Sequence, residues 1–244
     1  MLGKPFIILS TVDSTNNHAM GLIREGKAAD GTAIFALEQT EGKGQRGKVW
    51  DSHLGENILL TVIAGSKNLS IHQPFLLSAI TALACCDFFS KYAGDETSIK
   101  WPNDLYWRDR KAGGILIENV IKNQQWDNTV IGMGININQT QFGQLENKTV
   151  SLKQITGKSF DPILLAEELC GFLDARLNQI KSTPAETIIE EYNKHLFKRN
   201  EKVKFRKDSL VFEAKVVGAT AEGDLEIERG IVEKIHHGSV EWIL

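Results

Sequence analysis

Three short stretches of this chain bring together residue types that can carry out chemistry. The first is Ser14-Thr15-Asn16, the second is the glycine-rich run from Gln39 to Trp50, and the third joins Lys100–Asp104 to Lys111–Gly114. Each falls at a predicted turn or strand end, which is where binding and catalytic residues concentrate. These stretches are therefore the candidates for a functional site.

The glycine-rich run reads EQTEGKGQRGKVW from Glu38 to Trp50 and has neither helical nor strand periodicity. Glycines let backbone N–H groups approach an anion closely, and the cations between them add positive charge. The run therefore favours a ligand or intermediate that bears phosphate. Its GxGxxG spacing is not decisive, because a dinucleotide-binding turn opens a helix, whereas here an apolar segment follows at Asn57–Ile63. The spacing alone also permits a solvated surface loop.

Asp104 and Lys111 fall on either side of a predicted hairpin that turns at Arg108-Asp109-Arg110. A lysine there could face an anion, and the carboxylate could hold a metal or act as a base. The alternative is a surface ion pair, which contributes little to stability. Ser14 or Thr15 likewise suits the N-cap of a helix, a position that can also face a ligand.

The elements that must position these residues follow from apolar periodicity and turn residues. Helices are predicted over 14–25, Gln73–Tyr92, Pro162–Ile180 and Ala185–Leu196. Strands are predicted over Phe6–Leu9, Thr32–Leu37, Asn57–Ala64, Ser98–Trp101, Leu105–Trp107, Ala112–Ile121 and Asp127–Asn138. Beyond Arg199, short strands are predicted over Glu201–Phe205, Leu210–Val217, Asp224–Glu228, Ile231–Ile235 and Val240–Ile243. The pattern predicts an α+β body, residues 1–197, whose mixed, mostly antiparallel sheet is flanked by helices, and a small C-terminal β-barrel, residues 198–244.

Composition excludes several classes of protein. The 244 residues are 42% hydrophobic and 24% charged, as in an ordinary globular protein. A net charge of -3 argues against a general nucleic-acid binder, because counterion release needs an excess of cations. We expect a cytoplasmic protein with no membrane span, because the N-terminus lacks a signal pattern and the apolar runs are short. Cys85, Cys86 and Cys170 lie in apolar helical patterns and are interpreted as reduced core residues.

Five motifs together resemble the biotin protein ligases. They are DSTN (13–16), EQTEGKGQRG (38–47), KWPNDL (100–105), RKAGGILIE (110–118) and GMGIN (132–136). The KWPND motif followed by Lys111, Gly113 and Gly114 is far more specific than the GxGxxG spacing. The resemblance implies a catalytic domain of the class II synthetase-like type with an SH3-like C-terminal domain. It also implies joining of biotin, via ATP and biotinyl-5′-AMP, to a lysine of a biotin carboxyl carrier protein such as the acetyl-CoA carboxylase subunit.

The resemblance also assigns roles to individual residues. It implies that the catalytic residues are Lys111, Asp104 and Arg46. It implies that biotin is bound by Ser14, Thr15, Asn16, Gln39, Gly42, Lys43, Gly44, Gln45, Trp50, Lys111 and Gly114. It implies that the nucleotide is bound by Lys43, Arg46, Trp50, Asn103, Lys111 and Asn136, and that Mg²⁺ arrives with the ATP phosphates, with Asp104 as its candidate protein ligand. The glycine-rich run would then fold over the adenylate and keep water from it.

The chain departs from the family pattern in two places. Many members read GRGRRGR where this chain reads GKGQRGK, so Gln45 replaces a frequent arginine and the loop is less cationic. Some relatives carry a helix-turn-helix domain before the first strand, whereas here that strand begins near Phe6, so we expect a monofunctional ligase that binds no DNA. The alternatives are a lipoate or other acyl ligase of the same fold and a non-catalytic biotin-binding module. A homodimer is a further expectation from the family.

Overall fold

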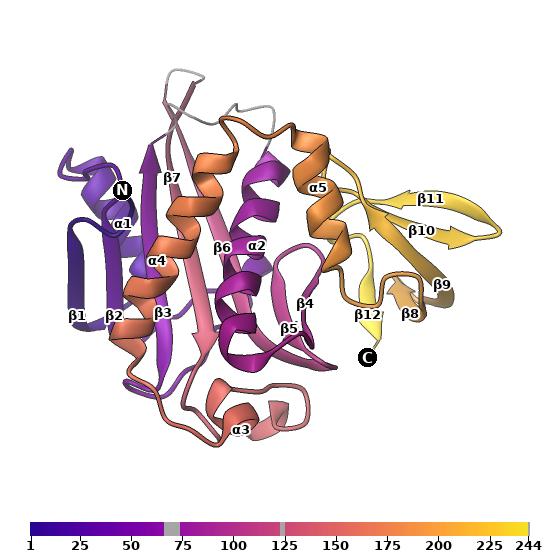
Figure 1. Cartoon of the computed structure of the whole chain (residues 1–244), viewed down its shortest axis with the longest axis horizontal. Coiled ribbons are helices and arrows are strands. Elements are labelled where there is room, and N and C mark those ends of the chain that lie inside the picture. Colours follow the sequence, from indigo (N-terminus) through magenta and orange to yellow (C-terminus); the bar gives the residue numbers. More distant parts are fainter. Residues whose placement is uncertain (66–73, 123–124, 244) are drawn as a thin grey trace.

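The computed structural model describes residues 1–65, 74–122 and 125–243, and its main element is a seven-stranded sheet in the order β1-β2-β3-β7-β6-β5-β4 (Figure 1). The strands are β1 Phe6–Val12, β2 Ala33–Gln39, β3 Asn57–Gly65, β4 Thr97–Lys100, β5 Asp104–Trp107, β6 Arg110–Lys122 and β7 Gln125–Asn136. β1 and β2 pair in parallel, and the other neighbours in this sheet pair antiparallel. The predicted mixed, mostly antiparallel sheet is confirmed.

Helices pack on both faces of this sheet, with α1 on one face and α2 and α4 on the other. The helices are α1 Thr15–Arg24, α2 Pro74–Ala93, α3 Leu152–Thr156, α4 Pro162–Gln179 and α5 Ala185–Lys194. Successive residues of a strand point to opposite faces, so Phe35 belongs to the main core with α2 and α4, while Ile34 packs with Ala19 of α1 in a second, smaller cluster. Figure 1 shows α2 and α4 lying side by side across one face. The face that carries α1 is therefore the one left partly open.

The long helix α2 is a core element. It is the one helix among the described residues that is long and apolar enough, by length and composition, to cross a membrane, but 72% of that window is buried inside the protein. Its two cysteines are buried and free, as is Cys170 of α4. Burial raises the pKa of Cys86 to about 12, so this thiol stays protonated at neutral pH. The prediction that these cysteines lie in the core is confirmed, and their reduced state stays a prediction.

The C-terminal strands form a separate five-stranded sheet in the order β11-β10-β9-β8-β12. Its strands are β8 Lys202–Lys207, β9 Leu210–Ala219, β10 Leu225–Arg229, β11 Ile231–Ile235 and β12 Glu241–Ile243. The Trp101 indole N–H donates to the Gly223 carbonyl at 3.1 Å, and the Asn193 side chain of α5 bonds both the N–H and the carbonyl of Ala219. The small appended β-domain is confirmed, and the boundary at residues 197 and 198 stays a prediction.

Helix α3 and several element ends differ from the prediction. The sequence analysis contains no helix at Leu152–Thr156, although Ser151 and Gln154 form a capping box there. Five residues are too few for the apolar periodicity to show. The predicted start of the second helix at Gln73 lies outside the described residues. Other boundaries move by one to three residues, because hydrogen bonding rather than apolar pattern decides where an element ends.

Candidate active site

The predicted site residues gather on the sheet face that carries α1. Gly132 and Gly134 of β7 and Gly114 of β6 present no side chain to this face, and the Trp50 indole packs onto Gly134 and Gly114. A Cβ at Gly134 would lie 2.6 Å from Cε2 of Trp50, closer than real Cβ contacts allow. The Trp50 indole N–H is buried and has no hydrogen-bond partner among the residues that the structure describes. Glycine is therefore required for the indole to lie this close to the sheet.

The β5–β6 hairpin brings the two most specific residues together. The Lys111 ammonium donates to Asp104 Oδ1 at 2.7 Å, and these side chains are 32% and 24% exposed. The same ammonium lies 5.6 Å from the centre of the Trp50 ring. A cation, a carboxylate and an aromatic wall thus meet beneath the glycine-rich loop, in a partly buried setting where a charge interacts more strongly than in bulk water.

Two asparagines brace this hairpin. The Asn136 amide donates to the carbonyl of Val150 at 3.2 Å and to that of Lys111 at 3.5 Å, and the Asn103 amide donates to the Ile115 carbonyl. Both asparagines are buried. In this structure their side-chain N–H groups hold the backbone around Lys111, and their assignment to the nucleotide stays a prediction.

Lys100 is a site residue that the sequence analysis leaves unassigned. The tight turn after β4 pairs Lys100 directly with Asp104, and its ammonium donates to the Tyr106 hydroxyl at 3.3 Å. Burial lowers the pKa of Lys100 to about 8, with the Asp104 charge opposing this and the Lys111 and Lys48 charges adding to it. The sequence could have indicated this pairing, because a turn of three residues between Lys100 and Asp104 places the two opposite one another in a hairpin.

A cluster of buried polar residues surrounds the start of α1. The backbone N–H and hydroxyl of Thr15 donate to Gln39 Oε1 at 2.8 and 3.0 Å, and the Thr15 and Thr61 hydroxyl oxygens lie 2.8 Å apart. Ser14 is the N-cap residue of α1, but its side chain makes no capping hydrogen bond. The prediction of Ser14 as the N-cap residue is confirmed in position, although the helix start is held by the bond from the Thr15 N–H to Gln39 rather than by the Ser14 side chain. Thr61 was missed, because β3 reads as uniformly apolar around it.

Asn16 points into the protein rather than toward open space. Its amide donates to Glu118 Oε2 at 2.7 Å and to the Leu116 carbonyl at 3.3 Å, and its oxygen accepts from the Thr61 hydroxyl at 2.7 Å. Asn16 is 3% exposed and lies directly over Gly132. These bonds tie α1 to β6 and β3, and the assignment of Asn16 to biotin stays a prediction.

The glycine-rich loop is folded back on itself. Lys43 and Val49 form a β-bridge around a single turn of 3₁₀ helix at Gln45–Gly47, and Trp50 N–H donates to the Gly42 carbonyl at 2.9 Å. Gly44 N–H donates to the carbonyl of Lys48 at 2.7 Å. The sequence predicts no regular structure here, because the turn depends on bonds between the two arms of the loop rather than on local periodicity.

The two loop cations that were predicted to meet the nucleotide lie apart in this structure. The Lys43 ammonium donates to Asn17 Oδ1 of α1 at 2.6 Å. Arg46 has a left-handed backbone, with φ of 58°, and its guanidinium lies against Gly238 of the C-terminal sheet. Neither cation contacts the Lys111–Asp104 pair, so their roles toward ATP remain predictions.

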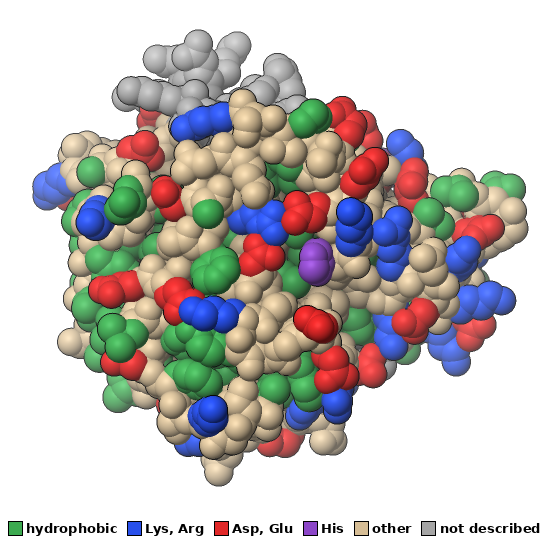
Figure 2. Space-filling model, viewed as in Figure 1, with side chains coloured by type: hydrophobic (Ala, Val, Ile, Leu, Met, Phe, Trp, Pro, Cys, Tyr) green, Lys and Arg blue, Asp and Glu red, His purple; other side chains and the backbone are tan. Residues whose placement is uncertain are grey.

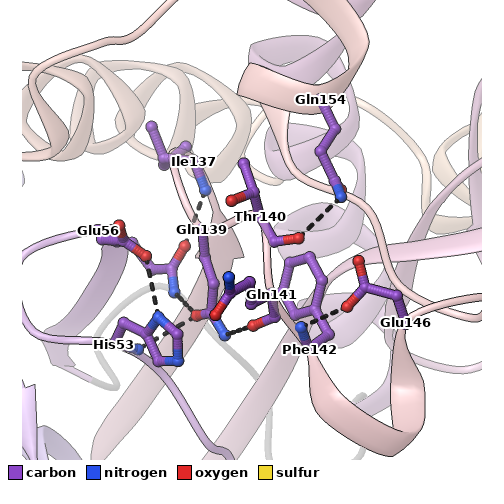
Figure 3. Close-up of polar contacts among 10 residues, drawn as sticks. His53, Glu56, Ile137, Gln139, Thr140, Gln141, Phe142, Glu146 and Gln154 are labelled. Atoms are coloured by element: carbon purple, nitrogen blue, oxygen red, sulfur yellow. Dashed lines mark hydrogen bonds and ion pairs between the residues drawn. The ribbon is translucent and has the colours of Figure 1, made fainter.

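A buried polar network fixes the chain where it leaves this loop (Figure 3). Gln139 Oε1 accepts from the His53 N–H at 3.2 Å and from the Asn57 amide at 2.5 Å, and Asn57 Oδ1 accepts from the Ile137 N–H at 3.0 Å. Asn57 and Gln139 are 1% and 2% exposed. The network joins the start of β3 to the segment after β7, and it holds the exit of the loop in one place.

Comparison with known proteins identifies the family. The sequence profile of the biotin/lipoate A/B protein ligase family matches residues 8–136, which include every predicted site residue. The chain belongs to this family. Within it, the bifunctional ligase/repressor BirA of Bacillus subtilis is 26% identical over 99% of this chain and 75% of the relative. The biotin–[acetyl-CoA-carboxylase] ligase of Mycobacterium tuberculosis is 28% identical over 70% of this chain and 64% of the relative.

Solved structures support the fold. The biotin protein ligase of Aquifex aeolicus, determined in complex with biotin and ATP, superposes with a TM-score of 0.81, covers 97% of each chain and is 24% identical. At this identity the likeness establishes the fold of both sheets. The resemblance drawn from the five sequence motifs is confirmed at the level of the family.

Proposed function

We propose that this chain is an ATP-dependent ligase that joins biotin, through biotinyl-5′-AMP, to a lysine of a biotin carboxyl carrier domain. Family membership and the names of the curated relatives support this activity. The observation that carries it is the Lys111–Asp104 pair held beneath the Trp50 indole and the glycine-rich loop. A lipoate ligase is the alternative within the family.

In the first step, a biotin carboxylate oxygen attacks the α-phosphorus of ATP and the bond to the pyrophosphate leaving group breaks. Two anions must meet, so positive charge placed at the reaction centre lowers the barrier. The proposed source is Lys111, assisted by Lys100, which lies opposite Asp104 across the preceding β4–β5 turn. Removing one preorganised donor of this kind typically costs about 10²- to 10³-fold in rate.

In the second step, a carrier lysine amine attacks the carbonyl carbon of the mixed anhydride, and AMP leaves. A lysine with an ordinary pKa of about 10.4 must lose a proton before or during the attack. Asp104 is the proposed acceptor, because it is the carboxylate that contacts Lys111 and is partly exposed. Release of the Asp104–Lys111 bond by bound ligand would leave Asp104 free to accept that proton.

The ureido head of biotin needs both donors and acceptors, which the buried group around α1 provides. Thr15, Gln39 and Thr61 supply hydroxyl and amide groups in one cluster, and the Ser14 hydroxyl adjoins it. Trp50 is the proposed apolar wall, and its unpartnered indole N–H can donate to a bound ligand. The glycines beneath it let the indole lie close to the sheet.

The residues present fit a magnesium ion held mainly by substrate phosphates. The described residues contain no group of three His, Cys, Asp or Glu side chains able to hold a metal, and Asp104 is the one carboxylate of the hairpin cluster. Asp104 is the proposed protein ligand, and the ion would neutralise phosphate charge.

One assay tests the proposal directly. We expect exchange of labelled pyrophosphate into ATP that depends on biotin and is absent with lipoate. Replacing Lys111 by Met should reduce the exchange about 10²- to 10³-fold. The matched control is Lys158→Met, because Lys158 is exposed in the segment before α4, far from the hairpin in sequence. Exchange that requires lipoate, or equal loss in both variants, would contradict the proposal.

Three further properties complete the proposal. The edge strand β1 pairs only with β2 among the described residues, and Ile8 on it is 50% exposed, which supports a homodimer through this edge, testable by sedimentation. Figure 2 shows cations and anions interspersed over the face in view, which with the net charge of -3 supports the absence of DNA binding, testable by a gel shift at physiological salt. Three free, buried cysteines support a cytoplasmic location, testable by cell fractionation.

A further inference from the structure

Arg46 of the glycine-rich loop reaches across to the turn between β11 and β12. A Cβ built on Gly238 of this turn would overlap the Arg46 guanidinium, so the guanidinium occupies the space that any side chain at position 238 would need. The contact joins the loop over the active site to a different sheet of the protein.

The turn that receives Arg46 is held by hydrogen bonds. Ser239 N–H donates to the His236 carbonyl at 3.0 Å, and the His236 ring bonds Asp224 at 2.6 Å. The next residue, His237, packs edge-on against Trp101 with ring centroids 5.6 Å apart. Burial and the Arg46 charge lower the pKa of His237, and the Asp104 charge opposes this shift.

Trp101 connects this turn to the catalytic hairpin. Its indole N–H bonds the Gly223 carbonyl of the C-terminal sheet, and it follows Lys100 directly in the chain. The chain of contacts therefore runs from the loop through Arg46 to the turn, and from the turn through Trp101 to the hairpin that carries Asp104. Displacing Arg46 would remove this contact between the glycine-rich loop and the β11–β12 turn.

We propose that Gly238 is a positioning residue, whose missing side chain lets Arg46 dock on the β11–β12 turn and so lets the C-terminal sheet hold the glycine-rich loop closed. The docking itself is independent of the reaction. Its consequence, retention of the adenylate until the carrier lysine arrives, rests on the proposed function. The role of the C-terminal sheet is then to control the lifetime of an intermediate as well as to pack against the catalytic domain.

The test compares two turn glycines that have nearly the same φ. Gly238 has φ of 82° and Gly230, in the β10–β11 turn, has φ of 83°, so an alanine at either position is placed at a positive φ. A Cβ on Gly230 has no atom within 4 Å, whereas one on Gly238 meets Arg46. Gly230→Ala is therefore the matched control for Gly238→Ala, and it separates loss of docking from strain in the sheet.

The first measurement is the rate of tryptic cleavage after Lys48, followed by mass spectrometry. Because cleavage tracks the open population of the loop, Gly238→Ala should accelerate it about tenfold, with Gly230→Ala within about twofold of the parent. Arg46→Ala should accelerate it equally, and adding Gly238→Ala to Arg46→Ala should change nothing more. Equal rates for the two glycine variants, or additive effects in the double variant, would overturn the proposal.

The second measurement is escape of biotinyl-adenylate into solution in the absence of carrier. Escape should rise for Gly238→Ala and for Arg46→Ala, and Gly230→Ala should match the parent. If the parent makes no adenylate, the proposed function fails, while the cleavage rates still decide the docking. If Gly238→Ala does not fold, the Arg46→Ala variant decides it, since parent-like cleavage and escape in that variant would refute the role of the contact.

Discussion

The contact between Gly134 and the Trp50 indole predicts that Gly134→Ala destabilises the parent protein but stabilises a variant that lacks the indole. A Cβ at position 134 would lie 2.6 and 2.8 Å from Cε2 and Cζ2 of Trp50 and 3.0 Å from its Nε1. The neighbouring strands are fixed by the ladders of β7 with β3 and β6. Gly134→Ala therefore forces the indole away from the sheet instead of moving the sheet.

The expected magnitude follows from two opposing effects. Overpacking a well-packed site costs about 1–3 kcal/mol. Replacing Gly by Ala inside a strand returns about 0.5–1 kcal/mol when there is room for the Cβ. Gly134→Ala should therefore destabilise the parent protein by up to about 2.5 kcal/mol. In a Trp50→Ala background the clash disappears, and the same change should stabilise by about 0.5–1 kcal/mol.

Urea unfolding of the four proteins in this cycle measures both values. The midpoint should shift in opposite directions in the two backgrounds while the slope m stays constant, since constant m shows that the unfolded states are comparable. Gly114→Ala is an internal comparison, because its Cβ would lie 3.3 Å from Cζ3 of Trp50 and needs only a small adjustment. An equal change in free energy with and without the indole would refute this account of the site.

Three further predictions concern the charged residues. Asp104→Asn should lower transfer from purified adenylate to carrier by about 10²- to 10⁴-fold; parent-like transfer in single-turnover assays would remove Asp104 as the proton acceptor. The pKa of Lys100 is about 8 in the folded protein, against 10.5 for the free side chain, so the unfolded state binds more protons between these two pH values. The free energy of unfolding should therefore rise with pH from about 8 toward 10, by up to about 1 kcal/mol per pH unit. Lys100→Met should abolish this rise in chemical unfolding at pH 8 to 9.5, and an unchanged pH dependence would contradict the assignment. Gln45→Arg should restore a cation to the loop and slow the escape of biotinyl-adenylate, whereas an unchanged escape rate would show that the less cationic loop retains its intermediate equally well.

The sequence predicted most elements of the fold, because their signals are local. The apolar runs of β3 and α2 and the turn at residues 108 and 109 each depend on a few neighbouring residues. Helix α3 was missed because it is too short for periodicity. The parallel pairing of β1 with β2 was not foreseen, because register between strands depends on contacts that no single segment contains.

For the site, the chain by itself determined which residue types are available and which family they belong to. The pairing of Asp104 with Lys111 follows from hairpin spacing, and the structure places them 2.7 Å apart. Tertiary structure alone decided where the loop cations go. The Lys43 ammonium contacts Asn17 of α1, and the Arg46 guanidinium contacts Gly238, a residue far later in the chain. The sequence does not show which way a charged side chain points, and the packing of the C-terminal sheet beside the loop is what places Gly238 next to Arg46.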